Sequence, residues 1–199
     1  PPRSTLFPYT TLFRSMKKII VGNDAIVETM LNGIAFAHPG KLRRLEGFNV
    51  ITRRSINENK VALVSGGGSG HEPAHAGYVG EGMLDAAVAG NVFASPSADR
   101  VLKGIQEASS GKGVLLIIKN YSGDIMNFSL AKELAEMEGI EVDSVVVKDD
   151  VAVKDSTYST GRRGIAGTVL VHKIAGAKAK SGASLAEVKR VAEKTIANI

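Results

Sequence analysis

The positions of apolar residues along the chain predict strands that alternate with helices. Short apolar runs that end at glycine or polar residues are typical of strands, and they lie at 49–52, 61–65, 114–118 and 142–147. Longer stretches with apolar residues on one helical face lie at 24–36, 98–108, 125–138, 166–180 and from 184 onward. The last of these helices also has a start signal, since Ser184 and Glu187 have the spacing of a capping box. This alternation favours right-handed βαβ units, and therefore an α/β fold with a mostly parallel sheet flanked by helices.

The strand predicted at 61–65 runs directly into an unusual glycine-rich stretch. It continues as Gly66-Gly-Gly-Ser-Gly70 and then presents His71. Glycine allows positive φ angles and lets a ligand approach main-chain N–H groups closely, while Pro73 suits the first turn of a helix. We therefore expect a strand, a glycine-rich turn that holds His71, and a short helix over 72–78. In open α/β sheets ligands bind beyond the carboxyl ends of the strands, so this turn is a candidate small-molecule site.

By the same rule, polar residues that follow the other strands should gather at the same edge of the sheet. The predicted set is His71, Glu72, Lys119, Asn120, Asp124 and Asp149. A histidine at a turn can act as a general base near neutral pH. Lys119 can neutralise a phosphate or donate to a substrate oxygen. Asp124 is either a functional carboxylate or simply a turn residue or helix N-cap.

Known motifs that partly match this region differ from it in decisive residues. His71-Glu-Pro-Ala-His75 has the HExxH spacing of zinc metalloproteases, but that site needs both histidines on one helix, and Pro73 places the helix start between them. We therefore interpret His75 as a packed or hydrogen-bonded histidine. A phosphate-binding loop needs Lys-Ser/Thr after its last glycine, and the dinucleotide fingerprint needs glycine at position 71. Gly161-Arg-Arg-Gly164 remains open between a phosphate or partner site and a solvated basic turn.

Composition narrows the class of protein further. The chain has 199 residues, of which 44% are hydrophobic and 23% charged, as is ordinary for a soluble globular protein. It has no cysteine, which excludes disulfides, thiolate nucleophiles and cysteine-ligated zinc, and which fits a reducing compartment such as the cytoplasm. Its charge of +5 is spread along the chain and aromatic residues make up 5%, so no nucleic-acid partner is expected. No apolar run has the length of a membrane helix.

The first fifteen residues differ in character from the rest. They resemble the translation of a sequencing-adaptor oligonucleotide placed before a start at Met16, and they lack the features of a signal peptide. We expect residues 1–15 to be a non-native, disordered leader, and residues 16–199 to form the domain.

Three blocks of sequence together resemble one family. They are Val64-Ser-Gly-Gly-Gly-Ser-Gly-His-Glu-Pro73, Gly113-Val-Leu-Leu-Ile-Ile-Lys-Asn-Tyr-Ser-Gly-Asp124, and Asp149-Asp-Val-Ala-Val153 with Gly161-Arg-Arg-Gly164. They closely resemble the dihydroxyacetone kinase family, in its substrate-binding K subunit or domain. The resemblance covers residues 16–199, and it implies the N-terminal half of the K-domain fold, truncated at its C-terminus.

The resemblance also implies an activity and a set of site residues. Members of the family phosphorylate dihydroxyacetone, a three-carbon ketose, on a hydroxyl group. The positions that match the substrate-binding residues of the family are Gly68, Ser69, Gly70, His71, Lys119 and Asp124. Of these, His71 matches the proton acceptor and Asp124 a carboxylate that binds the substrate hydroxyls, so these two are the expected catalytic residues. No metal site is expected in this chain.

The family divides its active site between several parts. A second histidine in the later part of the K domain forms a hemiaminal with the substrate, and none of His38, His71, His75 and His172 matches it. We therefore expect this chain alone to bind dihydroxyacetone weakly and to turn it over negligibly. The resemblance places Mg-ATP or Mg-ADP on a separate L domain or subunit, with ADP rephosphorylated by a phosphotransfer-chain protein. A homodimer is also expected.

A binding protein without catalysis is the alternative. It would be a regulatory paralogue that senses dihydroxyacetone, or a fatty-acid-binding α/β protein of similar topology. The presence of both His71 and Asp124 favours the enzyme, because binding alone does not require a base beside the substrate.

Overall fold

A single twisted sheet lies at the centre of the chain. The computed structural model describes residues 22, 25–55, 59–153 and 161–199, so the leader expected at 1–15 lies outside the described residues. Within them the sheet has six strands in the order β1-β2-β4-β3-β5-β6. The strands are β1 Leu42–Arg44, β2 Val50–Arg53, β3 Ala62–Ser69, β4 Ala86–Val92, β5 Val114–Lys119 and β6 Val142–Val147. The predicted strands at 49–52, 114–118 and 142–147 are confirmed.

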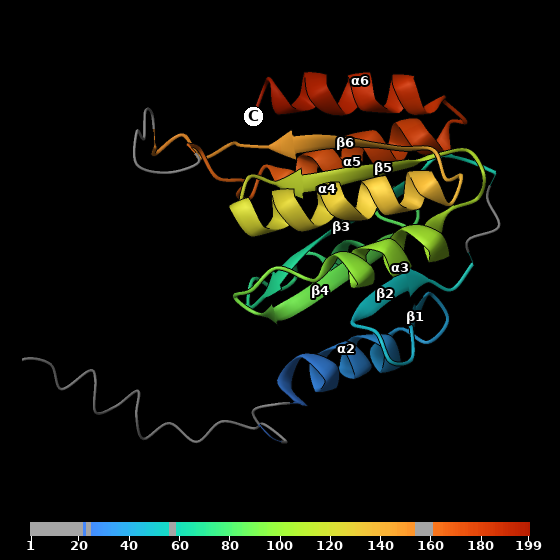
Figure 1. The fold of residues 1–199 in the computed structure, drawn as a ribbon, viewed down its shortest axis with the longest axis vertical. Helices are drawn as coiled ribbons and strands as arrows, with labels where there is room; N and C mark the ends of the chain where they lie inside the picture. The colour runs from blue at the N-terminus through green and yellow to red at the C-terminus, as the bar shows by residue number, and fades with distance from the viewer. Residues whose placement is uncertain (1–21, 23–24, 56–58, 154–160) are drawn as a thin grey trace, which may run out of the picture.

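Helices cover both faces of this sheet. They are α2 Ile26–Ala37, α3 Ala98–Ala108, α4 Ser122–Met137, α5 Thr168–Lys180 and α6 Leu185–Ile196, with a 3₁₀ helix η2 at Ala76–Tyr78. Figure 1 shows α3 and α4 side by side on one face, and their apolar residues pack into one core. The apolar residues of α2, η2, α5 and α6 pack into a second core on the other face. None of the helices in the described part of the chain is long and apolar enough to cross a bilayer.

The direction of the strands confirms the predicted fold class. Strands β3, β4, β5 and β6 pair in parallel, while β1 and β2 add two antiparallel strands at one edge. Every residue of β5 is buried, as expected for a parallel strand with a helix layer on each side. Its side chains alternate between the two cores, with Leu115 and Ile117 in one and Leu116 and Ile118 in the other.

The connections between strands open a crevice at one edge of the sheet. The chain passes from β4 to β5 through α3 and from β5 to β6 through α4, in one direction and over one face. From β3 to β4 it passes in the opposite direction, and η2 covers the opposite face. This is the arrangement that right-handed crossovers produce. The chain therefore leaves the carboxyl ends of the neighbouring strands β3 and β5 toward opposite faces of the sheet. A place where neighbouring strands connect in opposite directions is a topological switch point, and open α/β sheets bind ligands there.

The glycine-rich stretch is part of a strand, so the predicted glycine turn is wrong. Strand β3 continues to Ser69 because the space beside its glycines is filled by main chain from elsewhere. A Cβ atom at Gly66 would lie 2.3 Å from the carbonyl oxygen of Val88, and one at Gly68 would lie 2.8 Å from the amide nitrogen of Ala94. Glycine is needed here for close packing rather than for a reversal of the chain.

The helical predictions held with one exception. The helix at 98–108 is confirmed as α3, and Ser184 caps α6 in a capping box with Glu187. The helix at 125–138 begins earlier, at Ser122. The helix predicted over 72–78 is wrong, since residues 72–75 form turns and only the single 3₁₀ turn η2 follows.

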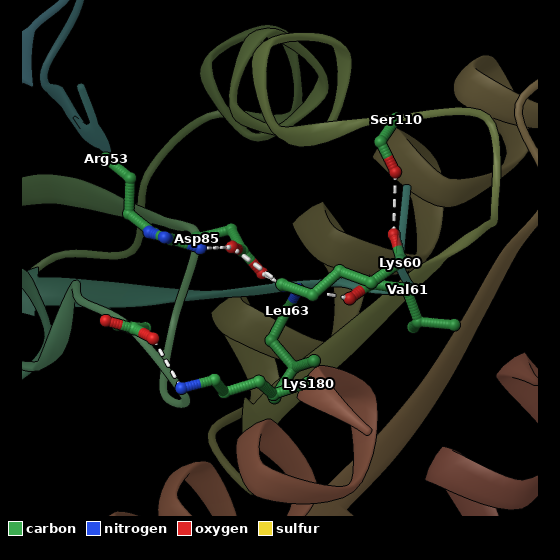
Figure 2. A network of polar contacts seen from close by, with 8 residues as sticks. Arg53, Lys60, Val61, Leu63, Asp85, Ser110 and Lys180 are labelled. Atoms are coloured by element: carbon green, nitrogen blue, oxygen red, sulfur yellow. Dashed lines mark hydrogen bonds and ion pairs between the residues drawn. The ribbon is translucent and has the colours of Figure 1, made fainter. Parts of the chain in front are cut away.

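A buried ion-pair network lies at the amino ends of β3 and β4, opposite the crevice at their carboxyl ends (Figure 2). Asp85 lies directly before β4 and is 2% exposed. Its carboxylate accepts hydrogen bonds from Lys60 Nζ at 2.7 Å, from Arg53 Nη1 at 3.1 Å and from the amide of Leu63 at 2.9 Å. Ser110 Oγ donates to the carbonyl oxygen of Lys60 at 2.6 Å, so the segment after α3 is joined to the same cluster.

Replacing Gly66 with alanine is expected to lower the free energy of unfolding by about 1–3 kcal/mol, because the new methyl group would overlap the Val88 carbonyl in a packed core. Gly33→Ala is the matched control. Gly33 lies in α2 with no atom within 4 Å of the added Cβ, so this change should be neutral or stabilise the protein by up to about 1 kcal/mol. Urea unfolding of both variants measures the difference, and equal effects would contradict the packing explanation.

Candidate functional site

The candidate site lies at the crevice between the carboxyl ends of β3 and β5. At its floor is Gly67, and polar groups from distant parts of the chain converge on the space beside its Cα atom. The position that a Cβ would take lies 3.4 Å from Asp124 Oδ2, 3.5 Å from His75 Nε2 and 3.7 Å from Lys119 Cε. A Cβ at position 67 would be in van der Waals contact with all three side chains, so glycine leaves a small space between them.

Asp124 is the buried carboxylate of the site. It lies in the first turn of α4, rather than in the loop that the sequence predicted, and is 3% exposed. Ser95, which follows β4, donates a hydrogen bond from Oγ to Asp124 Oδ1 at 2.5 Å. Burial raises the pKa of Asp124, although the Ser95 hydrogen bond and the charge of Lys119 oppose the rise. The carboxylate is therefore a strong acceptor for a ligand hydroxyl.

Lys119 supplies a cation close to this carboxylate. It is the last residue of β5 and its side chain is largely buried. Burial lowers the pKa of Lys119, and the charge of Asp124 opposes that shift. Its Nζ atom lies 5.5 Å from the centre of the Tyr121 ring. Gly164 packs against Lys119 from the other side, since a Cβ there would lie 2.8 Å from Lys119 Cβ.

His71 lies at the mouth of the site. It follows the end of β3 in a turn, as predicted, and its side chain is exposed. Its ring contacts the Phe93 ring edge-on, with the ring centres 5.4 Å apart. His71 and Lys119 both line a cavity of about 260 Å³ that extends toward α5. The structure therefore places these two predicted residues on one cavity.

Gly68, Ser69 and Gly70 lie beside His71, and each has a structural reason to be there. The tight contact of Gly68 with Ala94 is described above. Ser69 turns its hydroxyl away to donate to the carbonyl oxygen of Gly90 at 2.7 Å. Gly70 has φ of 109°, and a Cβ there would lie 2.6 Å from the Phe93 ring. Their predicted contact with substrate stays a prediction.

A buried chain of polar side chains runs behind the site, and sequence reasoning missed it. Ser65 Oγ lies 3.2 Å from His75 Nδ1, which lies 3.4 Å from His172 Nε2. His75 is packed and hydrogen-bonded, as interpreted from the sequence, but it also lines the cavity. Burial lowers the pKa of His75, and it lowers that of His172 to about 3, so both imidazoles are neutral at pH 7.

The other polar residues predicted at this edge form hydrogen bonds with main-chain groups. Glu72 accepts a hydrogen bond from the amide of Gly70 at 3.1 Å. Asn120 Nδ2 donates to the carbonyl oxygen of Arg162 at 2.7 Å. Asp149 accepts hydrogen bonds from the amides of Ile165 at 2.6 Å and Gly167 at 2.8 Å. Asn120 and Asp149 thus fasten the segment at 161–167, which includes Gly164 beside Lys119.

The zinc-helix alternative lacks the geometry that it requires. Residues 72–75 form turns rather than a continuous helix, so His71 and His75 do not share a helix face. Within the described ranges, no group of three or more histidine, aspartate or glutamate side chains is arranged to hold a metal ion.

Comparisons with known proteins agree with one another. Residues 32–199 match the Dak1 domain. A dihydroxyacetone-binding subunit DhaK of a PTS-dependent dihydroxyacetone kinase, from Listeria innocua, is 58% identical over 184 residues, which is 92% of this chain and 56% of that protein. The chain thus spans little more than half the length of this relative.

Two further comparisons extend this picture. A crystal structure of the dihydroxyacetone kinase from Citrobacter freundii, in complex with AMP-PNP and Mg²⁺, superimposes with a TM-score of 0.86 at 47% identity, covering 92% of this chain and 34% of that one. The DhaKLM operon coactivator DhaQ from Lactococcus lactis is 45% identical over 175 residues, which is 88% of this chain and 53% of the coactivator. Proteins named as kinases and a protein named as a coactivator are therefore both similar to this chain.

Proposed function

The chain belongs to the Dak1 domain family, and we propose that it is the dihydroxyacetone-binding part of a dihydroxyacetone kinase. In this proposal a substrate hydroxyl receives the phosphoryl group. The observation that carries the proposal is the convergence of buried Asp124, Lys119 and the open space at Gly67 on one crevice. A carboxylate with a raised pKa beside a cation suits the recognition of a hydroxyl that must lose its proton.

The roles of individual residues follow from this proposal. Asp124 accepts a hydrogen bond from a substrate hydroxyl, and Lys119 donates to a substrate oxygen. His71, which is exposed and lines one cavity with Lys119, takes up the proton when the hydroxyl attacks the phosphoryl donor. Gly68, Ser69 and Gly70 contact the substrate through their main chain, since the side chain of Ser69 is occupied elsewhere.

Other parts of the active site are assigned to partners. We place the phosphoryl donor, Mg-ATP or a rephosphorylated Mg-ADP, on an L domain or subunit, with a phosphotransfer-chain protein supplying the phosphoryl group in the second case. A homodimer, a cytoplasmic location and covalent capture of dihydroxyacetone by a histidine outside this chain complete the proposal.

A regulatory protein that senses dihydroxyacetone is the second candidate. It is favoured by the 45% identity to a protein named as an operon coactivator. Both candidates bind dihydroxyacetone, and they differ in whether phosphoryl transfer follows.

The test uses the protein at the full length of its relatives, mixed with a nucleotide-binding L subunit and each phosphoryl donor. Turnover of dihydroxyacetone is expected, and Asp124→Asn and His71→Ala should each lower kcat by at least about tenfold, because each removes a group that acts on the reacting hydroxyl. Glu133→Gln, on the exposed face of α4, is the matched control and should keep kcat within about twofold.

Three results would count against this assignment. Full kcat in both variants would remove Asp124 and His71 from the mechanism. Binding of dihydroxyacetone without turnover from either donor would favour the regulatory candidate. A wild-type protein that does not bind dihydroxyacetone would overturn both candidates.

A further inference from the structure

His75 presents an unused nitrogen to the candidate site. The residue is 6% exposed, and its Nε2 atom has no hydrogen-bond partner among the described residues. The atom faces the space beside Gly67, where it lies 3.5 Å from the position of a Cβ, on the same space as Asp124 Oδ2. A buried polar atom without a partner is costly, so a ligand that supplies one gains affinity there.

The partners of His75 determine which nitrogen carries the proton. Ser65 Oγ lies 2.6 Å from the carbonyl oxygen of Ile117, which can only accept, so the single hydroxyl proton of Ser65 points there. The 3.2 Å contact between Ser65 Oγ and His75 Nδ1 then requires Nδ1 to be the donor, because otherwise two lone pairs would face each other. His172 Nε2, 3.4 Å away, accepts from the same N–H.

A neutral imidazole with its proton on Nδ1 has a bare lone pair on Nε2. Burial keeps His75 neutral by lowering its pKa, and the charges of nearby Lys119 and His71 act in the same direction. Nε2 is therefore a fixed hydrogen-bond acceptor that faces the crevice. Asp124 Oδ2 is a second acceptor on the same space.

We propose that His75 contacts the ligand directly and that its Nε2 atom accepts a hydrogen bond from a hydroxyl group. Asp124 Oδ2 and His75 Nε2 are two acceptors on one small space, and they select a ligand that presents hydroxyl donors. The identity of the ligand as dihydroxyacetone rests on the proposed function.

Two substitutions at His75 separate the contact with ligand from the contact with Ser65. In His75→Asn, the shorter amide keeps a donor at the place of Nδ1 but has no atom at the place of Nε2. In His75→Gln, the longer side chain restores an acceptor at the place of Nε2. We expect the Asn variant to weaken dihydroxyacetone binding by about tenfold, and the Gln variant to keep affinity within about threefold of wild type. His38→Asn, exposed beyond α2, is the matched control and should change nothing.

Nitrogen NMR of the wild-type protein, at the full length of its relatives and labelled with ¹⁵N-histidine, gives a reading that does not depend on the variants folding. The Nε2 resonance of His75 should have the shift of an unprotonated nitrogen, and dihydroxyacetone should move it toward the shift of a hydrogen-bonded one, while His38 stays unchanged. Inorganic phosphate should leave His75 unchanged.

Several outcomes would overturn the assignment. A proton on Nε2, or a His75 resonance that stays still when dihydroxyacetone shifts His71, excludes His75 as a ligand contact and leaves the proposed function standing. An equal loss of dihydroxyacetone affinity in the Asn and Gln variants also excludes His75 as a ligand contact and leaves the proposed function standing. If dihydroxyacetone moves no resonance of the full-length protein, both the assignment and the proposed function fail.

Discussion

Replacing Asp85 by asparagine is expected to lower the free energy of unfolding by about 3–5 kcal/mol. The carboxylate of Asp85 is the shared partner of Lys60 and Arg53, and all three side chains are nearly buried. Asparagine has a similar shape but no charge, so Lys60 would lose its buried counter-ion and Arg53 would lose its ion pair with Asp85. Urea unfolding at pH 7 measures the loss.

Two further variants show whether charge burial is the cause. Asp143→Asn removes a carboxylate that pairs with Lys189 and Lys132 at the surface, where it is about a third exposed, and it should cost less than about 1 kcal/mol. The triple variant Arg53→Met, Lys60→Met, Asp85→Leu removes all three charges, and it should recover most of the stability that Asp85→Asn loses. Equal losses for Asp85→Asn and Asp143→Asn would contradict the explanation.

Lowering the pH from 7 to 4.5 is expected to remove about 2.5 kcal/mol of stability through His172 alone. The folded state holds His172 neutral, with its pKa lowered to about 3 by burial, while an unfolded histidine takes up a proton near pH 6.5. The unfolded state therefore binds more protons in this range, so the contribution is complete above about pH 6.5 and is lost progressively as the pH falls toward about 3. His75 acts in the same direction.

The variant His172→Gln isolates this contribution, because glutamine does not titrate. Its unfolding free energy, measured in urea at several values between pH 7 and 4.5, should depend less steeply on pH than that of the wild-type protein, although its stability at pH 7 is lower. Asp124, whose pKa is raised by burial, contributes with the opposite sign in both proteins and cancels in the comparison. Parallel pH curves for the two proteins would show that His172 does not stay neutral in the fold.

The alternation of strands and helices could be predicted because each element has its own local pattern. Strand β5 is apolar from Val114 to Ile118 and α6 has its capping box, so both could be predicted without knowledge of the rest of the chain. The glycines of β3 misled the prediction, since glycine generally marks a turn. These glycines are needed because the backbone of Val88 and Ala94 occupies the space that side chains would fill. That contact is between segments far apart in the sequence, so a local pattern cannot predict it.

Part of the candidate site could also be predicted from the sequence. The rule that ligands bind beyond the carboxyl ends of strands pointed to Lys119 and Asp124, which lie together beside Gly67, and to His71, which lines one cavity with Lys119. Their contact with a substrate stays a prediction. It could not identify Ser95 as the partner of Asp124, because the two are 29 residues apart. His75 was interpreted as a packed or hydrogen-bonded histidine because Pro73 separates it from His71. Its partner His172 could not be identified, because the two are 97 residues apart and only the fold brings them together.

Strand β3 connects two regions whose variants would fail in different ways. At its amino end lies the cluster of Asp85, and at its carboxyl end lies the crevice with Gly67. Loss of the Asp85 carboxylate reduces the amount of folded protein in a cell and leaves each surviving molecule competent, whereas loss of the Asp124 carboxylate beside Gly67 impairs each molecule. A growth defect alone would not distinguish them. A screen of variants in this protein therefore needs a measure of protein level beside the measure of activity.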